Sequence, residues 1–379
     1  MRIAIFGTRG IPARYGGFET FAEELAPRLV RRGHAVTVFG RAGVIDPALH
    51  LTQRDGVTLV VLPAPRSKHF ETVVHTLRCA LWSRREPFDV ALVCNGANFL
   101  SLFLLARLGT RTALLVDGIE SARRKWGWLG RVVHRLGERL GPSLADVVVA
   151  DCDVIAGHYR RRGAPALATI AYGAEAPRCC TTGALERLGV RSRGYVLYVS
   201  RLEPENNADL VVRAFRQSTL AYDLVVVGDA PYATAYKAEV RRLAAGDPRI
   251  RFAGFVFGEG YDELRAHAAC WIQATEVGGT HPALLEAMAA SLPVIAQEIP
   301  EHREVLGDTG WYFGLHAADE LTARLGEVLA PGAAAAEERE RRGQAAYARV
   351  RERYDWEKVA DAYEALARGL AAGSTGSPG

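Results

Sequence analysis

A glycine-rich segment in the second half of the chain has the residue types of a phosphate-binding site. Residues 276–288 read EVGGTHPALLEAM, with Pro282 where a helix would begin. The main-chain amides of Gly279 and Thr280 at such a helix start can hold a diphosphate without a metal ion. Glu286 falls one turn into the predicted helix, where its two carboxylate oxygens could accept both hydroxyls of a ribose. Taken alone, Glu286 would better suit an exposed helical glutamate.

Arg201 could supply the positive charge that a diphosphate site needs. It follows a strand-like run and opens the sequence RLEPENN, residues 201–207. A guanidinium there could grip phosphate oxygens bidentately and offset the charge of a departing nucleotide diphosphate, whereas a surface ion pair is the alternative. This segment and 276–288 should both lie at the carboxyl edge of one parallel sheet, where ligands bind in such folds. His281 stands in the same segment and could contact the phosphate or a sugar.

A second glycine-rich loop follows the first predicted strand, in GTRGIPARYGGFE (7–19). Gly16 and Gly17 stand where backbone could approach a phosphate or a developing anion at a helix N-terminus, although a tight strand-to-helix turn explains them equally well. A dinucleotide-binding loop fits poorly, because the spacing is G-x-x-G and no ribose-binding acid ends the second strand. Arg41 could meet the 2′-phosphate of NADP, so an NADP-binding loop is a weak alternative.

Asp117, in DGIE (117–120), ends another predicted strand. It could orient a transferred sugar or act on an acceptor proton, while a turn or N-cap aspartate is the alternative. The sequence DCD at 151–153 imitates a D-x-D metal motif, but it opens a predicted helix and is better explained as an N-cap. The histidines lack metal-ligand spacing, and we predict no metal site.

The elements that must position these residues alternate between short apolar runs and helix-length segments. Runs of about five residues predict parallel sheets covered on both faces, hence two doubly wound α/β domains. The predicted strands are 2–6, 35–39, 58–62, 90–94, 112–116 and 147–150, then 195–199, 224–227, 250–252, 270–273 and 293–296. Helices are predicted at 18–32, 208–216 and 282–290, and the stretch 174–193, rich in Gly, Arg, Pro and Thr, is predicted to link the domains.

Composition narrows the class of protein. The 379 residues are 49% hydrophobic and carry a formal charge of +4, which is too small for the footprint of a nucleic-acid binder. No apolar run is long enough for a membrane span, and no signal-peptide pattern precedes the first strand, so we expect a cytoplasmic protein. The six cysteines lack disulfide or zinc spacing and are predicted to be buried thiols. The segment 123–131 mixes cations with two tryptophans and could touch an anionic membrane or a lipid acceptor; a solvated loop is as good an explanation.

Together these motifs resemble the family 4 glycosyltransferases of the GT-B fold, and within them the subgroup with a rhamnosyltransferase-like N-terminal domain. The resemblance covers nearly the whole chain, to about position 368. The residues that carry it are 7–19, DGIE (117–120) with RKW (124–126), AYGA (171–174), RLEPENN (201–207), 276–288 and YDWEK (354–358).

The resemblance implies two Rossmann-like domains facing across a cleft. These would be an acceptor-side domain at 1–180, a nucleotide-sugar-binding domain at 190–352, a terminal helix at 353–371 crossing back to the first domain, and a disordered tail at 372–379. It also implies a metal-independent transferase that keeps the donor's anomeric configuration and needs no cofactor beyond the nucleotide diphosphate sugar.

The same resemblance assigns roles to individual residues. Arg201 would bind the diphosphate, Glu286 the ribose, and Gly16 and Gly17 would approach the phosphate and sugar. The donor site would be completed by Asn206, Gly278, Gly279, Thr280 and His281, with Asp117, Arg201 and Glu276 as catalytic residues.

Two positions depart from the broader family. Asn206 replaces the usual lysine five residues after the arginine, and Gly278 stands where the common pattern has a glutamate, with Glu276 two residues earlier. Both departures look typical of the subgroup.

The predicted function is therefore transfer of a hexosyl or deoxyhexosyl group to an acceptor in glycan, glycolipid or natural-product biosynthesis, with deoxythymidine diphosphate–rhamnose as first donor by subgroup analogy. The alternatives are a sugar phosphorylase, a nucleotide-sugar epimerase, or a non-catalytic nucleotide-sugar-binding activator.

Overall fold

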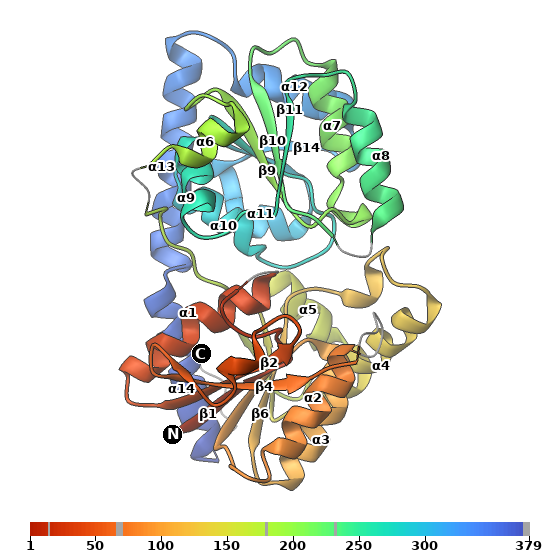
Figure 1. The fold of residues 1–379 in the computed structure, drawn as a ribbon, viewed down its shortest axis with the longest axis vertical. Coiled ribbons are helices and arrows are strands. Elements are labelled where there is room, and N and C mark those ends of the chain that lie inside the picture. The colour runs from red at the N-terminus through yellow and green to blue at the C-terminus, as the bar shows by residue number, and fades with distance from the viewer. Residues whose placement is uncertain (14–15, 66–70, 179–180, 231–232, 374–379) are drawn as a thin grey trace. The chain divides into compact units, whose positions relative to one another are not determined.

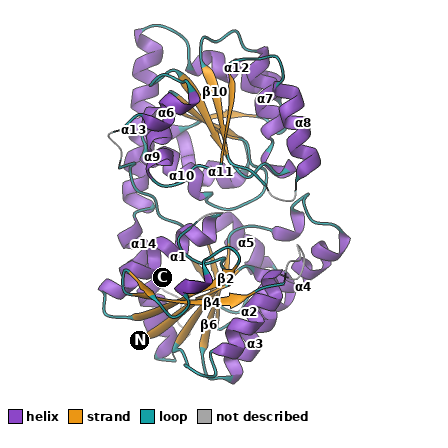
Figure 2. Ribbon diagram, in the orientation of Figure 1, coloured by secondary structure: helices purple, strands orange, loops and turns teal. Residues whose placement is uncertain are grey.

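A computed structural model describes residues 1–13, 16–65, 71–178, 181–230 and 233–373. The chain divides into two compact units, each shown with its elements in Figures 1 and 2. The first unit comprises Met1–Tyr172 together with Trp356–Gly379, and the second comprises Gly173–Asp355. Most of the predicted disordered tail, from position 374 onward, lies outside the described residues.

The first unit is built on an eight-stranded sheet in the order β3-β4-β2-β1-β5-β6-β7-β8. Every neighbouring pair is parallel except β3 and β4. The strands are β1 (Arg2–Phe6), β2 (Ala35–Ala42), β3 (Gln53–Arg54), β4 (Val57–Pro63), β5 (Val90–Cys94), β6 (Arg111–Val116), β7 (Val147–Ala150) and β8 (Leu167–Thr169). The helices are α1 (Gly17–Arg31), α2 (Glu71–Trp82), α3 (Phe99–Arg107), α4 (Trp128–Leu144), α5 (Asp153–Arg161) and α14 (Trp356–Ala371).

The second unit has a six-stranded, all-parallel sheet in the order β11-β10-β9-β12-β13-β14. Its strands are β9 (Tyr195–Val199), β10 (Asp223–Val227), β11 (Ile250–Gly254), β12 (Cys270–Gln273), β13 (Val294–Gln297) and β14 (Trp311–Phe313). Its helices are α6 (Gly183–Leu188), α7 (Ala208–Gln217), α8 (Thr234–Ala244), α9 (Glu259–His267), α10 (Pro282–Ala289), α11 (Pro300–Leu306), α12 (Ala318–Val328) and α13 (Ala333–Arg353).

The predicted fold class is confirmed in both units. The central strands are buried along their whole length because helices cover both faces of each sheet (Figure 2), as expected for near-continuous apolar strands. All eleven predicted strands are present, with bounds that differ by at most three residues at either end. Three short strands were not predicted, namely β3, β8 and β14, because two or three residues give too little hydrophobic pattern.

The chain leaves the first unit earlier than the composition suggested and later returns to it. The second unit begins at Gly173, and the stretch 174–193 contains helix α6. Helix α14 belongs to the first unit and packs against α1. There the Arg28 guanidinium lies 5.7 Å from the ring centre of Trp356 and pairs with Glu357. Among the described residues, none of the helices has the length and apolar character that crossing a bilayer would require.

Candidate functional site

Two loops of the second unit meet at the carboxyl edge of its sheet. Strands β9 and β12 are parallel neighbours, so the loops that follow them emerge side by side. The amide of Glu276, after β12, donates to the carbonyl of Glu205, after β9, at 2.9 Å. The Asn207 side chain donates to the carbonyl of Ala274 at 2.8 Å. The expected convergence of 201–207 and 276–288 is therefore present, and hydrogen bonds fix it.

Arg201 stands at the rim of this edge. Its side chain is 27% exposed, and its Nη1 lies 3.6 Å from a carboxylate oxygen of Glu203. Asn206 is buried, and its Nδ2 donates to the Arg201 carbonyl at 2.6 Å, while the hydroxyl of Tyr198 donates to the Asn206 carbonyl at 2.5 Å. The predicted donor-binding residue Asn206 thus has its side chain directed at the main chain of Arg201, which it holds in place.

The glycine segment before α10 is closely packed. Gly278, Gly279 and Thr280 are buried, and His281 is the N-cap residue with a positive φ of 51°. Pro282 is the first helical residue, as predicted. A Cβ atom on Gly278 would lie 2.3 Å from Cε1 of the His281 ring. Glycine is therefore required at 278 for the imidazole to keep its place.

Glu286 is half-buried and oriented by its neighbours, so the exposed-glutamate alternative is wrong. The hydroxyl of Tyr261, on α9, donates to Glu286 Oε2 at 2.6 Å. Arg265 lies one turn further along α9, where its Nη1 donates to the Glu286 carbonyl at 3.4 Å and its guanidinium stands 4.9 Å from the Tyr261 ring centre. Burial, then the Glu286 charge, raises the pKa of Tyr261 well above its usual value, so the phenol stays a donor.

Two further histidines flank this edge. Glu276 is largely buried, and its Oε1 lies 3.3 Å from Nδ1 of His316, in the loop after β14. His302 is fully buried on α11, donates through Nδ1 to the Gln297 carbonyl at 2.7 Å, and lies 4.9 Å from the His281 ring. Burial lowers the pKa of His302 to about 4, so its ring is neutral at physiological pH.

The glycine pair of the first unit caps α1. Gly16 is the N-cap residue with extended backbone, and its carbonyl accepts the amide of Glu19 at 3.1 Å. Gly17 is the first helical residue. The Glu19 carboxylate reaches back and accepts the amide of Arg9 at 2.7 Å, which ties the preceding loop to the helix. Residues 14 and 15 of the predicted motif lie outside the described residues.

Asp117 follows β6 in the first unit and accepts a hydrogen bond from the Tyr172 hydroxyl at 3.3 Å. It lines a small cavity together with two further acids, Glu120 and Glu138. Glu138 is buried and accepts both the amide and the hydroxyl of Ser121, at 3.0 and 2.9 Å. The predicted aspartate therefore stands within an acidic cluster that the sequence did not reveal.

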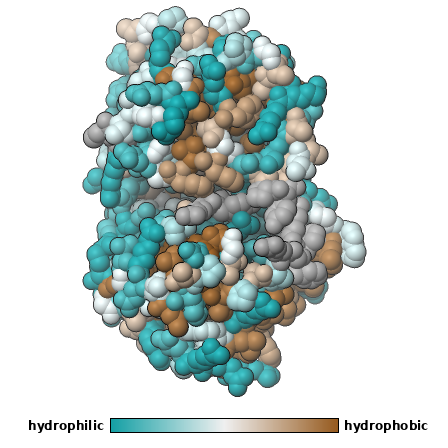
Figure 3. All heavy atoms as spheres, in the orientation of Figure 1, coloured by the Kyte–Doolittle hydropathy of each residue, from teal (hydrophilic) through white to brown (hydrophobic). Residues whose placement is uncertain are grey.

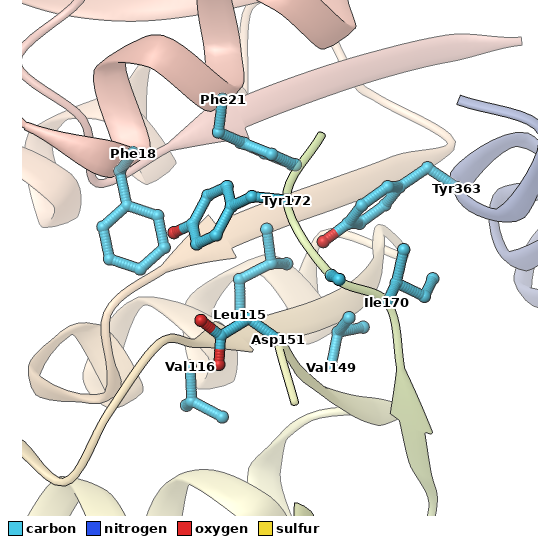
Figure 4. A pocket seen from close by; sticks show the side chains of 10 residues that line it. Phe18, Phe21, Leu115, Val116, Val149, Asp151, Ile170, Tyr172 and Tyr363 are labelled. Atoms are coloured by element: carbon cyan, nitrogen blue, oxygen red, sulfur yellow. The ribbon is translucent and has the colours of Figure 1, made fainter. Parts of the chain in front are cut away.

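A second pocket of the first unit lies close to this cluster and shares Val116 with it. Figure 4 shows Tyr172 and Tyr363 with Phe18 and Phe21 on one side of it and the Asp151 carboxylate on the other. Asp151 is 5% exposed. The pocket is thus an aromatic enclosure with one acid.

Two sequence interpretations in the first unit are corrected. Neither aspartate of the D-x-D imitation is the N-cap of α5: Cys152 is the N-cap residue and its side chain makes no capping hydrogen bond, while Asp153 is the first helical residue and accepts the Thr169 hydroxyl at 3.0 Å. In the segment 123–131, Arg123 is buried against Glu120, so it is no surface cation.

The structure adds residues that no motif indicated. Tyr261, Arg265, His316 and Glu138 reach the sites from other elements; the only local signal was the four-residue spacing of Tyr261 and Arg265 on α9. Four cysteines (79, 94, 152, 270) are free and buried, while Cys179 and Cys180 lie outside the described residues. Within the described part of the chain, no group of three or more His, Cys, Asp or Glu side chains is arranged to hold a metal ion.

Comparison with known protein families matches both units. Residues 16–173 match the glycosyl transferase 4-like domain, and residues 193–330 match the glycosyl transferases group 1 model.

Two characterised relatives are mannosyltransferases. The chain is 26% identical over 350 residues to the GDP-mannose-dependent alpha-(1-6)-phosphatidylinositol monomannoside mannosyltransferase of Mycolicibacterium smegmatis, covering 85% of this chain and 88% of that protein. It is 24% identical over 149 residues to O-antigen chain mannosyltransferase B of Escherichia coli, where the match spans 38% of this chain and only 39% of the relative.

Solved structures share the fold. Sucrose-phosphate synthase from Thermosynechococcus elongatus superposes with a TM-score of 0.80 at 19% identity, covering 98% of this chain and 100% of that one. Anabaena HepE in complex with UDP and glucose gives a TM-score of 0.77 at 17% identity, covering 97% and 100%.

Proposed function

Because the chain belongs to the family 4 glycosyltransferases of the GT-B fold, we propose that it moves a hexosyl or deoxyhexosyl group from a nucleotide diphosphate sugar to an acceptor hydroxyl with retention of anomeric configuration. The observation that carries the proposal is the pair of hydrogen-bonded loops after β9 and β12. They set the Arg201 guanidinium and the glycine segment before α10 at one edge of one sheet.

The donor's diphosphate would bind to main-chain amides and one guanidinium, without a metal ion. The loop positions Arg201 through Asn206, so the cation needs little reorganisation when charge develops on the leaving group. Gly279 and Thr280 precede α10, whose N-terminus favours an anion. We propose that Gly16 and Gly17, at the N-terminus of α1, approach the phosphate and sugar.

The remaining groups are assigned to the nucleoside and the sugars. Glu286, oriented by Tyr261, would accept the ribose hydroxyls. Glu276 and His281 would contact the transferred sugar, and Asp117 would orient that sugar or act on the acceptor hydroxyl. In a retaining transfer, the departing phosphate can itself receive the acceptor proton.

Two donor sugars are proposed, each supported by a different observation. Mannosyl donors are favoured by the named relatives, one of which is GDP-mannose-dependent. A rhamnosyl donor is favoured by the resemblance of the loop motifs to the rhamnosyltransferase-like subgroup. A polysaccharide or glycolipid acceptor is in line with the O-antigen and phosphatidylinositol mannoside substrates named for the relatives.

Thermal-shift measurements with GDP, UDP and dTDP and their mannose, glucose and rhamnose conjugates would test donor binding. A ligand at a hundred times its dissociation constant stabilises the folded chain by about 2.7 kcal/mol. The stabilising donor would then be incubated with acceptors, with the product anomer read by NMR and EDTA present in a parallel reaction. Inversion would overturn the proposed stereochemistry, and loss of transfer in EDTA would overturn the metal-free site.

A further inference from the structure

Helix α4 presents its large apolar side chains to solvent. Trp128 is 79% exposed, and Leu129, Val132, Leu136 and Leu140 are each 37–45% exposed. These five residues, here called the α4 ridge, recur at helical spacing along one side. A surface helix of a globular protein normally turns such a face to the core.

The inward face of α4 shows why the ridge points outward. Its buried residues are Gly130, His134, Gly137, Glu138, Gly141 and Pro142. A Cβ on Gly137 would lie 2.3 Å from the Gly96 carbonyl oxygen, and one on Gly141 would lie 2.7 Å from a Leu114 methyl. The helix backbone therefore lies directly on the domain, with no room for a large side chain between them. The ridge is thus not an unused core face.

A row of cations borders the ridge. Arg131, Arg135 and Arg139 are spaced four residues apart on α4, and all three are exposed. In the part of the chain that the structure describes, no acid pairs with any of them. Figure 3 shows exposed apolar side chains among hydrophilic ones on one face of the molecule, and the side chains of the α4 ridge are among the large apolar residues that are exposed. A helix with an apolar face and an adjacent row of arginines matches those that lie in the plane of a membrane interface.

We propose that the outer face of α4 docks on an anionic lipid bilayer. The α4 ridge would enter the boundary between headgroups and acyl chains, and the three arginines would meet lipid phosphates. A second copy of the chain is a poorer occupant, because the one acid of α4, Glu138, is buried, so a contact between two copies of this face would offer the arginine rows no acidic partner. Within the segment 123–131, the surface begins only at Trp128, since Arg123 is buried and Trp126 packs against His134 with ring centres 4.7 Å apart.

Docking would bring the first unit's acidic cluster to the bilayer. Only the short segment 118–127 separates Asp117 from Trp128, the first residue of α4. Docking on the bilayer would deliver lipid-linked acceptors to the enzyme, an inference that rests on the proposed function. Binding itself requires no turnover, so its failure and a failure of transfer are distinguishable.

The test is co-sedimentation of the full chain with vesicles of phosphatidylcholine alone and of phosphatidylcholine with phosphatidylglycerol in equal parts. The wild type should bind the anionic vesicles and lose that binding in high salt. Arg135→Glu/Arg139→Glu and Trp128→Ser/Leu136→Ser should each weaken partitioning by about tenfold or more. The matched controls are Arg191→Glu/Arg241→Glu and Leu315→Ser, which alter exposed residues of the second unit and should bind like the wild type.

Melting temperatures of the variants, and sedimentation velocity without lipid, complete the experiment. The melting temperatures should match the wild type, because the changed side chains are exposed. Equal vesicle binding by wild type and ridge variants would overturn the proposal. A wild-type dimer that the ridge variants abolish, without vesicle binding, would assign the ridge to a second copy instead.

Discussion

The two units hold their candidate groups by different means at the carboxyl edges of similar sheets. In the second unit, a hydrogen bond within one loop holds the main chain of Arg201, and another joins that loop to the start of the glycine segment. In the first unit, Asp117 lines a cavity together with the half-buried Glu120 and the buried Glu138. Main-chain amides and one cation suit a diphosphate, which every nucleotide-sugar donor carries. Side chains in the segment after β6 would instead set the acceptor, which differs from enzyme to enzyme.

The largest expected effect is the fall in turnover when Arg201 is removed from the site of the second unit. Arg201→Ala should lower kcat by about a hundredfold to a thousandfold, because it removes a preorganised charge that acts on the leaving group. Its unfolding free energy should change by less than about 0.5 kcal/mol, since the side chain is partly exposed. The control is Arg213→Ala, which removes an exposed arginine of the same unit that pairs with Asp209. Equal turnover in both variants would reject the assigned role of Arg201.

The next effect separates Glu286 from the residue that orients it. Glu286→Gln should raise the KM for the donor by roughly tenfold or more, because a charged hydrogen bond to the ligand is worth about 1.5–3 kcal/mol. Tyr261→Phe should raise KM less, by under about tenfold, since it removes only the neighbour's bond to Oε2. Steady-state kinetics would show both changes. A larger effect for Tyr261→Phe would place the phenol, rather than the carboxylate, against the donor.

Acid should lower the folding stability of both units for the same reason, which is a buried neutral histidine in each. His75 in the first unit and His302 in the second are both fully buried against a carbonyl, and burial lowers the pKa of each to about 4. The unfolded chain, with histidine near 6.5, binds more protons between these values, so stability falls as pH drops from about 6.5 to 4. Each histidine should cost about 2 kcal/mol at pH 5.

Hydrogen–deuterium exchange of β1 and β13 at pH 7 and pH 5, corrected for intrinsic exchange, would read the two units separately. His302→Gln should remove most of the acid-induced loss of exchange protection in β13 and leave the loss in β1 unchanged. His75→Gln should remove the loss in β1 and leave the loss in β13 unchanged. The explanation fails if β13 in the His302→Gln variant loses as much protection as in the wild type.

The smallest effect concerns helix packing in each unit. Gly137→Ala and Gly343→Ala would place a Cβ 2.3 and 2.2 Å from the carbonyl oxygens of Gly96 and Ser291. Each should cost at least about 1 kcal/mol, in the unit whose helix is lifted. Only Gly137→Ala should also reduce vesicle binding, because it displaces the α4 ridge. Chemical denaturation followed by exchange in each unit would check this, and loss of vesicle binding in Gly343→Ala would contradict it.

The sequence by itself determined the fold class, the eleven main strands, the loops that carry Arg201 and Glu276, and the helix that carries Glu286. Periodicity and strand-to-helix glycines are local signals, and parallel strands bring their carboxyl ends to one edge whatever the intervening sequence. The domain break was less well determined, because α6 begins within the predicted linker and is only six residues long.

Only the tertiary structure decided what surrounds these residues. Tyr261 reaches Glu286 from another helix, Asn206 turns toward its own loop, and Glu138 joins Asp117 from α4. The outward direction of the α4 ridge was likewise hidden, since periodicity identifies an apolar face but not what it faces. That direction depends on which side of the helix can pack most closely against its neighbours. In α4 this is the side of Gly137 and Gly141, so the apolar ridge faces away from the domain.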